Sequence, residues 1–337
     1  MQLLNRTPFA AERVLLPDPR GADTLVVVLK ATFSVKPPGA LRLADEQVPV
    51  QLADRFAGEP GKSSVLAASD LCPGKPGTDV VLRGSARPGR PMRWMDVSLR
   101  AGPCRKVVRV FGNRYWRGKI GLYLASEPED FEAIPLTWEN AFGGNDTSAE
   151  ESEAHEYEPR NPVGRGFRAR KSKLPIEGEL LPNIEDPKGL IDSPKARPAP
   201  SGLGFLGRDW QPRLRWAGTY DEKWRSERMP LLPDDFDPRY HDRAPEGLIA
   251  AQPPKAGEPV EAIGVHPAGP IRFALPDVRP SAQVLFEDET VDLPLKLDTL
   301  VLDADKPELL LTFAGHTKVH GRLHDIEAVL VDAEGFE

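Results

Sequence analysis

A run of apolar, β-branched residues marks the first part of the chain. Residues 25–35 read LVVVLKATFSV and are followed by the turn signal Pro-Pro-Gly, which together predict a buried strand. In residues 92–100, apolar and polar side chains alternate, as they do in a strand with one face in water. Two more strands are predicted at 78–86 and 105–112. Because the connections between these segments are short, the pattern favours an antiparallel meander.

The last part of the chain has the same character. Leu295 and Leu297 alternate with polar neighbours, and this alternation predicts a strand. Further short apolar segments lie at 300–302, 309–313 and 328–331. No repeat of fixed length is visible, which argues against a solenoid.

Residues 146–255 show neither the helical nor the strand period. This segment is crowded with proline and glycine, yet aromatic residues gather in its second half. They are Trp210, Trp216, Tyr220, Trp224, Phe236 and Tyr240. Disordered segments are poor in aromatic residues, so we expect irregular but packed structure here.

The stretch from 146 to 173 is an exception because its charges are segregated. An acidic run is followed by a basic run. The residues are Asp146, Glu150, Glu151, Glu153, Glu156 and Glu158, then Arg160, Arg165, Arg168, Arg170, Lys171 and Lys173. We interpret this stretch as a solvated loop, with an electrostatic docking site as the alternative.

Proline and glycine decide the fold class. The 337 residues include 36 Pro and 29 Gly, and prolines inside helices disrupt them. We therefore predict a mainly β protein, all-β or β-rich α+β, with antiparallel, sandwich-like sheets and long ordered loops. The chain divides into a β-rich lobe 1–145, an irregular region 146–255 packed on the sheets and a β-rich lobe 256–337. All three can belong to one domain.

Charge and hydropathy narrow the classes of partner. The formal net charge is −7 and the isoelectric point is about 5.6, so no global basic field attracts nucleic acid or an anionic membrane. No apolar run approaches the roughly 20 residues that span a bilayer, and the first residues lack the pattern of a signal peptide. We expect a cytoplasmic protein in which Cys72 and Cys104 are free thiols.

Two glycine motifs share the spacing of nucleotide-binding loops but lack their context. Gly202, Gly204 and Gly207 have the dinucleotide spacing, yet prolines surround them where a strand and a helix should lie. The Gly-Lys-Ser of residues 61–63 ends a phosphate-loop pattern whose first glycine is replaced by Phe56. We therefore predict no bound cofactor.

His316, His320 and His324 recur every four residues, which places them on one side of a helix or strand. Successive side chains on one element lie about 6 Å or more apart, so adjacent pairs could share a zinc ion but hardly all three. We predict a polar surface without a metal, and we keep a metal-assisted hydrolase as an alternative function. The sequence contains no serine elbow, zincin helix or paired Cys-x-x-Cys, so no catalytic residue is predicted.

Several segments, in order, resemble the signature stretches of the domain-of-unknown-function family 2169. From residue 58 to residue 245 they read GEPGKSSVLAASDLCPGKPGTDVVLRGSA, FGNRYW, IPLTWENAFGG, NPVGRGF, LPNIEDP, GFLGRDWQPRLRWAGTYDEKW and MPLLPDDFDPRYHDRAP. With TFSV before them and LDTLVLDADKPELLLTF after them, the resemblance covers nearly the whole chain.

The resemblance implies a non-enzymatic, cytoplasmic adaptor or chaperone of type VI secretion. Such proteins help to load a toxic effector onto the spike, which is a VgrG trimer capped by a PAAR-repeat protein. The implied partners are therefore the effector, the PAAR-repeat protein and VgrG. A permanent structural component of the spike is a further alternative.

The mixture of arginine and aromatic residues in the middle segment is the candidate partner surface, because interface hot spots are rich in rigid rings and planar guanidinium groups. The predicted partner-binding residues are Trp210, Arg213, Arg215, Trp216, Tyr220, Trp224 and Arg225. Alternatively, these rings only hold loops against the core.

Overall fold

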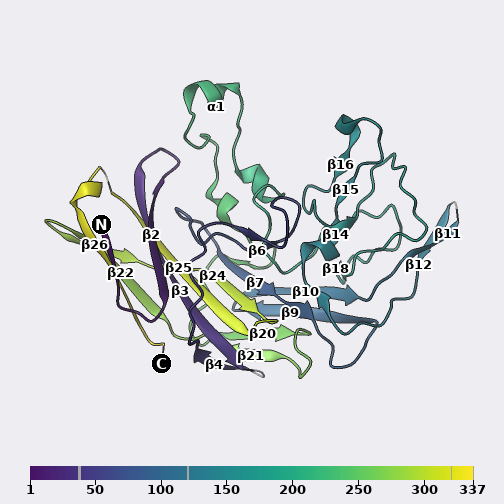
Figure 1. The fold of residues 1–337 in the computed structure, drawn as a ribbon, viewed down its shortest axis with the longest axis horizontal. Helices are drawn as coiled ribbons and strands as arrows, with labels where there is room; N and C mark the ends of the chain where they lie inside the picture. The colour runs from purple at the N-terminus through teal and green to yellow at the C-terminus, as the bar shows by residue number, and fades with distance from the viewer. Residues whose placement is uncertain (37–38, 120, 320, 337) are drawn as a thin grey trace.

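The computed structural model describes residues 1–36, 39–119, 121–319 and 321–336. Strands make up most of its regular structure, and the larger sheets are mostly antiparallel. The prediction of a mainly β fold is confirmed. Figure 1 shows an elongated molecule in which the large sheets follow one another along the long axis.

The largest sheet has seven strands in the order β19-β7-β24-β25-β3-β2, with β4 also paired to β3. Residues 24–33 of β3 are all buried, so both faces of this strand are covered, as its apolar run predicts. The strands are β2 (Ala10–Pro17), β3 (Asp23–Lys36), β4 (Ala40–Leu43), β7 (Thr78–Arg83), β19 (Ile249–Ala250), β24 (Lys296–Asp303) and β25 (Glu308–Lys318).

A five-stranded sheet has the order β18-β10-β9-β20-β21. In β9, Val97 and Leu99 are buried while Asp96 and Arg100 are exposed, which confirms the predicted alternation. The strands are β9 (Trp94–Ala101), β10 (Cys104–Phe111), β18 (Ile184–Glu185), β20 (Pro259–Ile263) and β21 (Ile271–Ala274).

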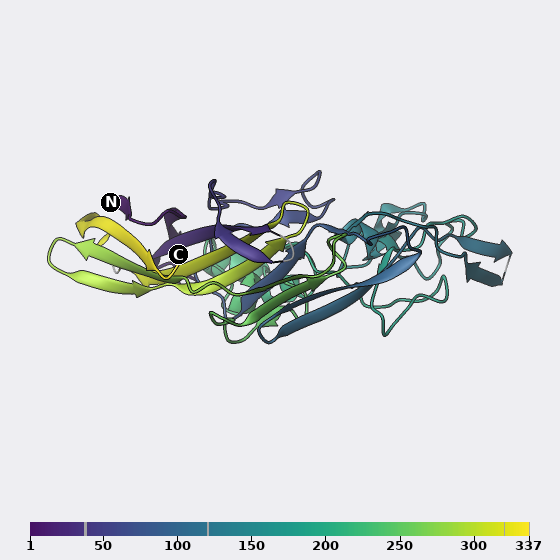
Figure 2. The ribbon, with the colours of Figure 1, turned by 90° about the horizontal axis from the view of Figure 1, so that it is seen from below.

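A four-stranded sheet, β1-β26-β22-β23, joins the two ends of the chain. Strand β1 runs parallel to β26, and β26 pairs antiparallel with β22. Figure 2 shows this sheet at one end of the flattened molecule. The strands are β1 (Gln2–Asn5), β22 (Arg279–Phe286), β23 (Thr290–Pro294) and β26 (Ile326–Glu334).

The remaining elements are short. The strands are β5 (Arg55–Phe56), β6 (Val65–Ala67), β8 (Ser85–Ala86), β11 (Trp116–Lys119), β12 (Leu122–Ala125), β13 (Ile134–Pro135), β14 (Phe142–Gly143), β15 (Asn145–Asp146), β16 (Glu156–Tyr157) and β17 (Arg165–Gly166). The helices are η1 (Trp138–Asn140), η2 (Ser152–Ala154), η3 (Arg213–Trp216), α1 (Glu222–Glu227), η4 (Pro238–His241) and η5 (Leu323–Asp325).

The predicted meander of the first lobe is wrong except at one hairpin. Strands β9 and β10 pair as neighbours, but β7 lies in the other sheet, where it runs parallel to β24. Strands β24 and β25 lie between β7 and β3. The first and last parts of the chain therefore share one sheet. Strand β3 is apolar on both faces, so it lies inside the sheet with a neighbouring strand along each edge. The pairing of β3 with β25 is longer than its pairing with β2.

Most buried side chains form one continuous core across the three large sheets. A second, smaller cluster holds the middle segment together and consists of Trp116, Phe142, Phe167, Leu181 and Ile191. Phe167, Leu181 and Ile191 of the irregular middle segment are therefore packed against Trp116 and Phe142 from the preceding part of the chain. Both cysteines are free and buried.

The solvated-loop interpretation of 146–173 needs correction at both ends of its acidic run. Asp146 is 1% exposed and Glu158 is 5% exposed. The Asp146 carboxylate accepts hydrogen bonds from the backbone amides of Ser148 and Ala169, at 3.0 and 2.9 Å. Loop amides that lack a sheet partner need such acceptors, so these carboxylates order the loop, whereas the acidic residues 150–156 between them are exposed.

Candidate partner-binding site

A segment comprising residues 212–240, here called the arm, stands away from the sheets with α1 at its tip (Figure 1). It leaves the body through η3 and returns through η4. None of its side chains belongs to the two buried apolar clusters. The arm is therefore a projection whose shape depends on local contacts.

Polar contacts hold the two limbs of the arm together. The carboxylate of Asp235 accepts hydrogen bonds from the Thr219 amide at 2.9 Å and from the Thr219 hydroxyl at 2.7 Å. These bonds hold the pKa of Asp235 below its ordinary value. At the tip, Asp221 caps α1 by accepting from the Trp224 amide at 2.8 Å, and the Trp224 indole donates to the Leu231 carbonyl at 2.9 Å.

The arm also rests on the turn between β2 and β3. The Arg228 guanidinium donates to the Pro19 carbonyl at 2.6 Å. Leu231 packs against Gly21, where a Cβ atom would lie 2.7 Å from the leucine side chain. Gly21 has φ of 80°, so both the turn and the contact require glycine.

Two of the predicted partner-binding residues are buried where the arm meets the body. Trp210 is 1% exposed and packs edge-on against Trp138, with ring centroids 5.9 Å apart. Arg213 is 7% exposed and donates to the carbonyls of Leu206 and Tyr240, at 2.8 and 3.0 Å. These residues anchor the base of the arm.

The other predicted residues reach the surface. Tyr220 is 53% exposed and meets the half-buried Trp224 edge-on, with centroids 4.7 Å apart. Trp216 is half-buried, and guanidinium groups of Arg215 and Arg239 lie 4.4 and 3.5 Å from its ring centroids. The exposed Arg225 pairs with Glu222 at 3.2 Å. The arm thus carries an aromatic and cationic surface.

Sequence reasoning missed apolar residues on the same surface. Met229 is 62% exposed and Leu214 is 44% exposed. It also missed Arg239, which Asp237 orients over Trp216 through an ion pair at 2.5 Å. An apolar residue outside any periodic pattern was the signal for Met229 and Leu214, whereas the stacking of Arg239 depends on the return of the chain through η4.

A buried ionic network fixes the chain directly after the arm. Arg243 contacts Asp79 at 3.2 Å and Asp298 at 2.7 Å, and Lys75 contacts the same two carboxylates at 2.5 and 3.2 Å. Burial raises the pKa of Asp79, but Lys75 and Arg243 outweigh burial and hold that pKa below its ordinary value. Asp79 therefore stays ionised, and the network ties residue 243 to β7 and β24.

The glycine motifs serve packing. A Cβ atom on Gly202 would lie 2.9 Å from the Trp138 ring, and one on Gly207 would lie 2.6 Å from the Trp210 ring. Residues 61–63 form a turn closed by an ion pair between Lys62 and Glu59 at 2.9 Å. These glycines give room for indole rings or close a turn.

The histidine motif is only partly visible. His316 is exposed near the end of β25 and His324 is exposed in η5, while His320 lies outside the described residues. Across the described ranges, no group of three or more His, Cys, Asp or Glu side chains is placed to hold a metal ion. The helices in those ranges are also too short to cross a membrane.

Residues 20–314 match the model of a family described as an uncharacterized protein conserved in bacteria, DUF2169. The chain belongs to this family. The matched range of this DUF2169 protein contains the arm, the ionic network and the whole five-stranded sheet. Strands β1 and β26 lie outside it. Neither the curated proteins nor the solved structures contain a match.

Proposed function

We propose that this DUF2169 protein is a non-enzymatic adaptor that binds a type VI secretion effector, or its PAAR-containing carrier, and helps to load it onto the VgrG spike. The observation that carries the proposal is the arm. It carries the exposed side chains of Tyr220 and Met229, and the guanidinium groups of Arg215 and Arg239 lie over its Trp216 ring. Large aromatic and apolar side chains exposed together mark protein interaction surfaces.

The arm is suited to this role because its exposed side chains are already oriented. The guanidinium groups of Arg215 and Arg239 lie over the Trp216 ring, and the Asp235 contacts fix the limb that carries Tyr220. A preorganised surface loses less side-chain entropy when a partner binds. The occupant proposed for the arm is a folded or extended part of the effector or of its carrier.

The first test is retention of cargo. An untagged type VI effector, a PAAR-repeat protein and VgrG from the same organism are expressed together with the tagged protein, and co-purification is measured. We expect at least the effector or its carrier to be retained. Loss of all three from the purified complex would contradict the adaptor proposal.

The second step of this test places the surface. We expect Trp216→Ala, Tyr220→Ala and Met229→Ala each to weaken cargo affinity by roughly tenfold or more, since truncating a hot spot commonly costs about 2 kcal/mol. The matched control is Leu122→Ala, because Leu122 is 70% exposed on β12, outside the arm. Thermal unfolding is measured on every variant, and unchanged affinity in the folded arm variants would move the cargo surface away from the arm.

Within the part of the chain that the structure describes, the geometry gives no specific support to a metal-assisted hydrolase or to a permanent spike component. Zinc analysis of protein prepared without a histidine tag checks the first alternative. Presence of the chain in the secreted fraction would favour the second over an adaptor that stays behind.

A further inference from the structure

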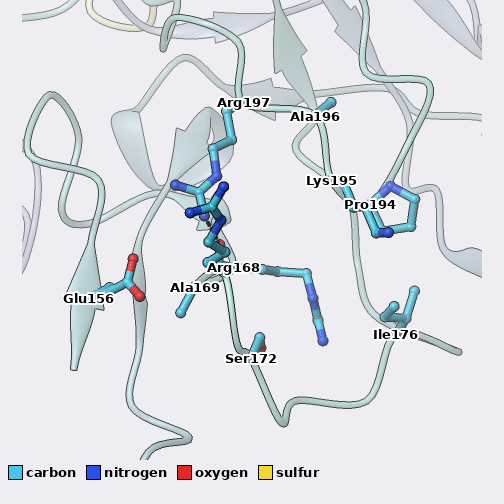
Figure 3. A pocket seen from close by; sticks show the side chains of 10 residues that line it. Glu156, Arg168, Ala169, Ser172, Ile176, Pro194, Lys195, Ala196 and Arg197 are labelled. Carbon is cyan, nitrogen blue, oxygen red and sulfur yellow. Dashed lines mark hydrogen bonds between the residues drawn. The ribbon is translucent and has the colours of Figure 1, made fainter. Parts of the chain in front are cut away.

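A second surface with the features of a binding site lies on the middle segment, apart from the arm. It is a cleft of about 700 Å³ between residues 168–176 and 194–197. Such a volume lies within the roughly 300–1,000 Å³ typical of binding clefts. In Figure 3, Arg168 and Arg197 lie near each other at the centre, Lys195 and Pro194 line one side, and Glu156 stands on the other.

The charges that line the cleft are mostly positive. The cationic residues are Arg168, Arg170, Lys195 and Arg197, and the acidic residue is Glu156. This local excess occurs in a chain whose formal net charge is −7. Close positive side chains in a concave surface focus a local field that attracts anionic groups.

The cations differ in how far they are already engaged. Arg168 is committed to the fold, because its guanidinium contacts Glu179 at 2.7 Å and the Leu174 and Pro175 carbonyls. Arg170 and Lys195 are exposed, and neither side chain has a hydrogen-bond or ion-pair partner among the described residues. Their charges are available to a ligand.

Arg197 is held in place but keeps free donors. One guanidinium nitrogen donates to the Arg168 carbonyl at 2.8 Å, and the group lies 5.1 Å from the Phe167 ring centroid. The buried Asp146 fixes the neighbouring backbone through the Ala169 amide. The wall of the cleft is therefore preorganised, which favours binding.

We propose that this cleft binds an extended acidic segment of a partner protein. The exposed cations supply charge complementarity to Asp or Glu side chains, while Ile176, Pro194 and Ala196 offer apolar surface between them. No aromatic ring lines the cleft within the described chain, so it lacks the stacking platform of single-stranded nucleic acid sites. The proposal does not depend on the arm.

The test uses a short fluorescein-labelled peptide in which glutamate alternates with leucine, titrated with the full chain and followed by anisotropy. A peptide with lysine in place of glutamate is the negative probe. We expect only the acidic peptide to bind, with affinity that falls as salt rises because exposed charges are screened. The double variant Arg170→Glu with Lys195→Glu should weaken binding by about tenfold or more.

The matched control is Arg90→Glu with Lys188→Glu, which makes the same change in total charge at exposed residues that line none of the cleft. It should bind the acidic peptide within about twofold of the unaltered protein, because it removes no direct ion pair. An equal loss of peptide affinity in both double variants would show that only the net charge of the protein matters, and it would overturn the proposed site. Absence of peptide binding, or complete competition by inorganic phosphate at matched ionic strength, would overturn the assignment to an acidic peptide.

Discussion

His241 and Asp242 are adjacent residues at the foot of the arm, and burial acts on them in opposite ways. Burial, with the nearby charge of Asp79, raises the pKa of Asp242 to about 6. Burial, with the charge of Arg243, lowers the pKa of His241 to about 4. Asp242 therefore contributes stability below pH 3.8 that is lost as pH rises through about 6. His241 contributes stability above pH 6.5 that is lost as pH falls through about 4.

The contributions of His241 and Asp242 to the free energy of unfolding change in opposite directions and largely cancel between pH 4 and 6. Replacing one of the two residues should therefore reveal the pH dependence due to the other. In Asp242→Asn, we expect the free energy of unfolding to rise with pH by roughly 1–3 kcal/mol more than in the unaltered protein between pH 4 and 6.5. Urea unfolding at a series of pH values measures this. In His241→Gln, the free energy of unfolding should fall with rising pH relative to the unaltered protein. Identical pH profiles in all three proteins would show that His241 and Asp242 do not contribute in opposite ways.

At the scale of elements, the arm illustrates how a projection keeps its shape without a core. Its limbs are joined by the two hydrogen bonds from Thr219 to Asp235 and by the bond from the Asp237 amide to the Trp216 carbonyl at 3.0 Å. At its tip, Asp221 caps α1. A helix as short as α1 is not stable alone. The shape of the arm therefore depends on these contacts and on the contacts of Arg228 and Leu231 with the β2–β3 turn. Regions with few buried apolar contacts open locally without global unfolding.

The Asp235 contacts give a test at this scale. In Asp235→Ala, amide hydrogen exchange across residues 216–236 should speed up by about tenfold or more, because the limbs lose the two hydrogen bonds that Thr219 donates to Asp235. Global stability should change by less than about 0.5 kcal/mol, since the site is on the surface. Glu227→Ala, at an exposed position in α1, is the control. Unchanged exchange in Asp235→Ala would show that other contacts hold the limbs.

Across the whole molecule, strands from distant parts of the chain complete each other's sheets. Strand β25 pairs with β3 over eleven residues, and β20 and β21 complete the sheet begun by β9 and β10. The pairing of β7 with β24 joins residues that are far apart in sequence. If the lobe 1–145 or the lobe 256–337 were separated from the rest of the chain, long edges of its strands would therefore lack partners.

Fragments test this dependence. We expect neither residues 1–255 nor residues 256–337, expressed alone, to show a cooperative thermal transition, because β3 and β7 lose β25 and β24. Co-expression of the two fragments should recover a complex that melts cooperatively. Circular dichroism during heating is the measurement, and a cooperative transition in residues 1–255 alone would show that the first part folds independently.

The sequence alone determined where most long strands lie, because period two and continuous β-branched runs are local consequences of which faces are buried. It also marked Tyr220, Trp224 and Trp216 as surface candidates. Only the tertiary structure decided that Trp210 packs against Trp138 in the core, because an aromatic residue in an irregular segment carries no period that separates inside from outside. The tertiary structure likewise decided the order of the strands and the cleft beside Lys195, because each depends on segments that meet only when the chain folds.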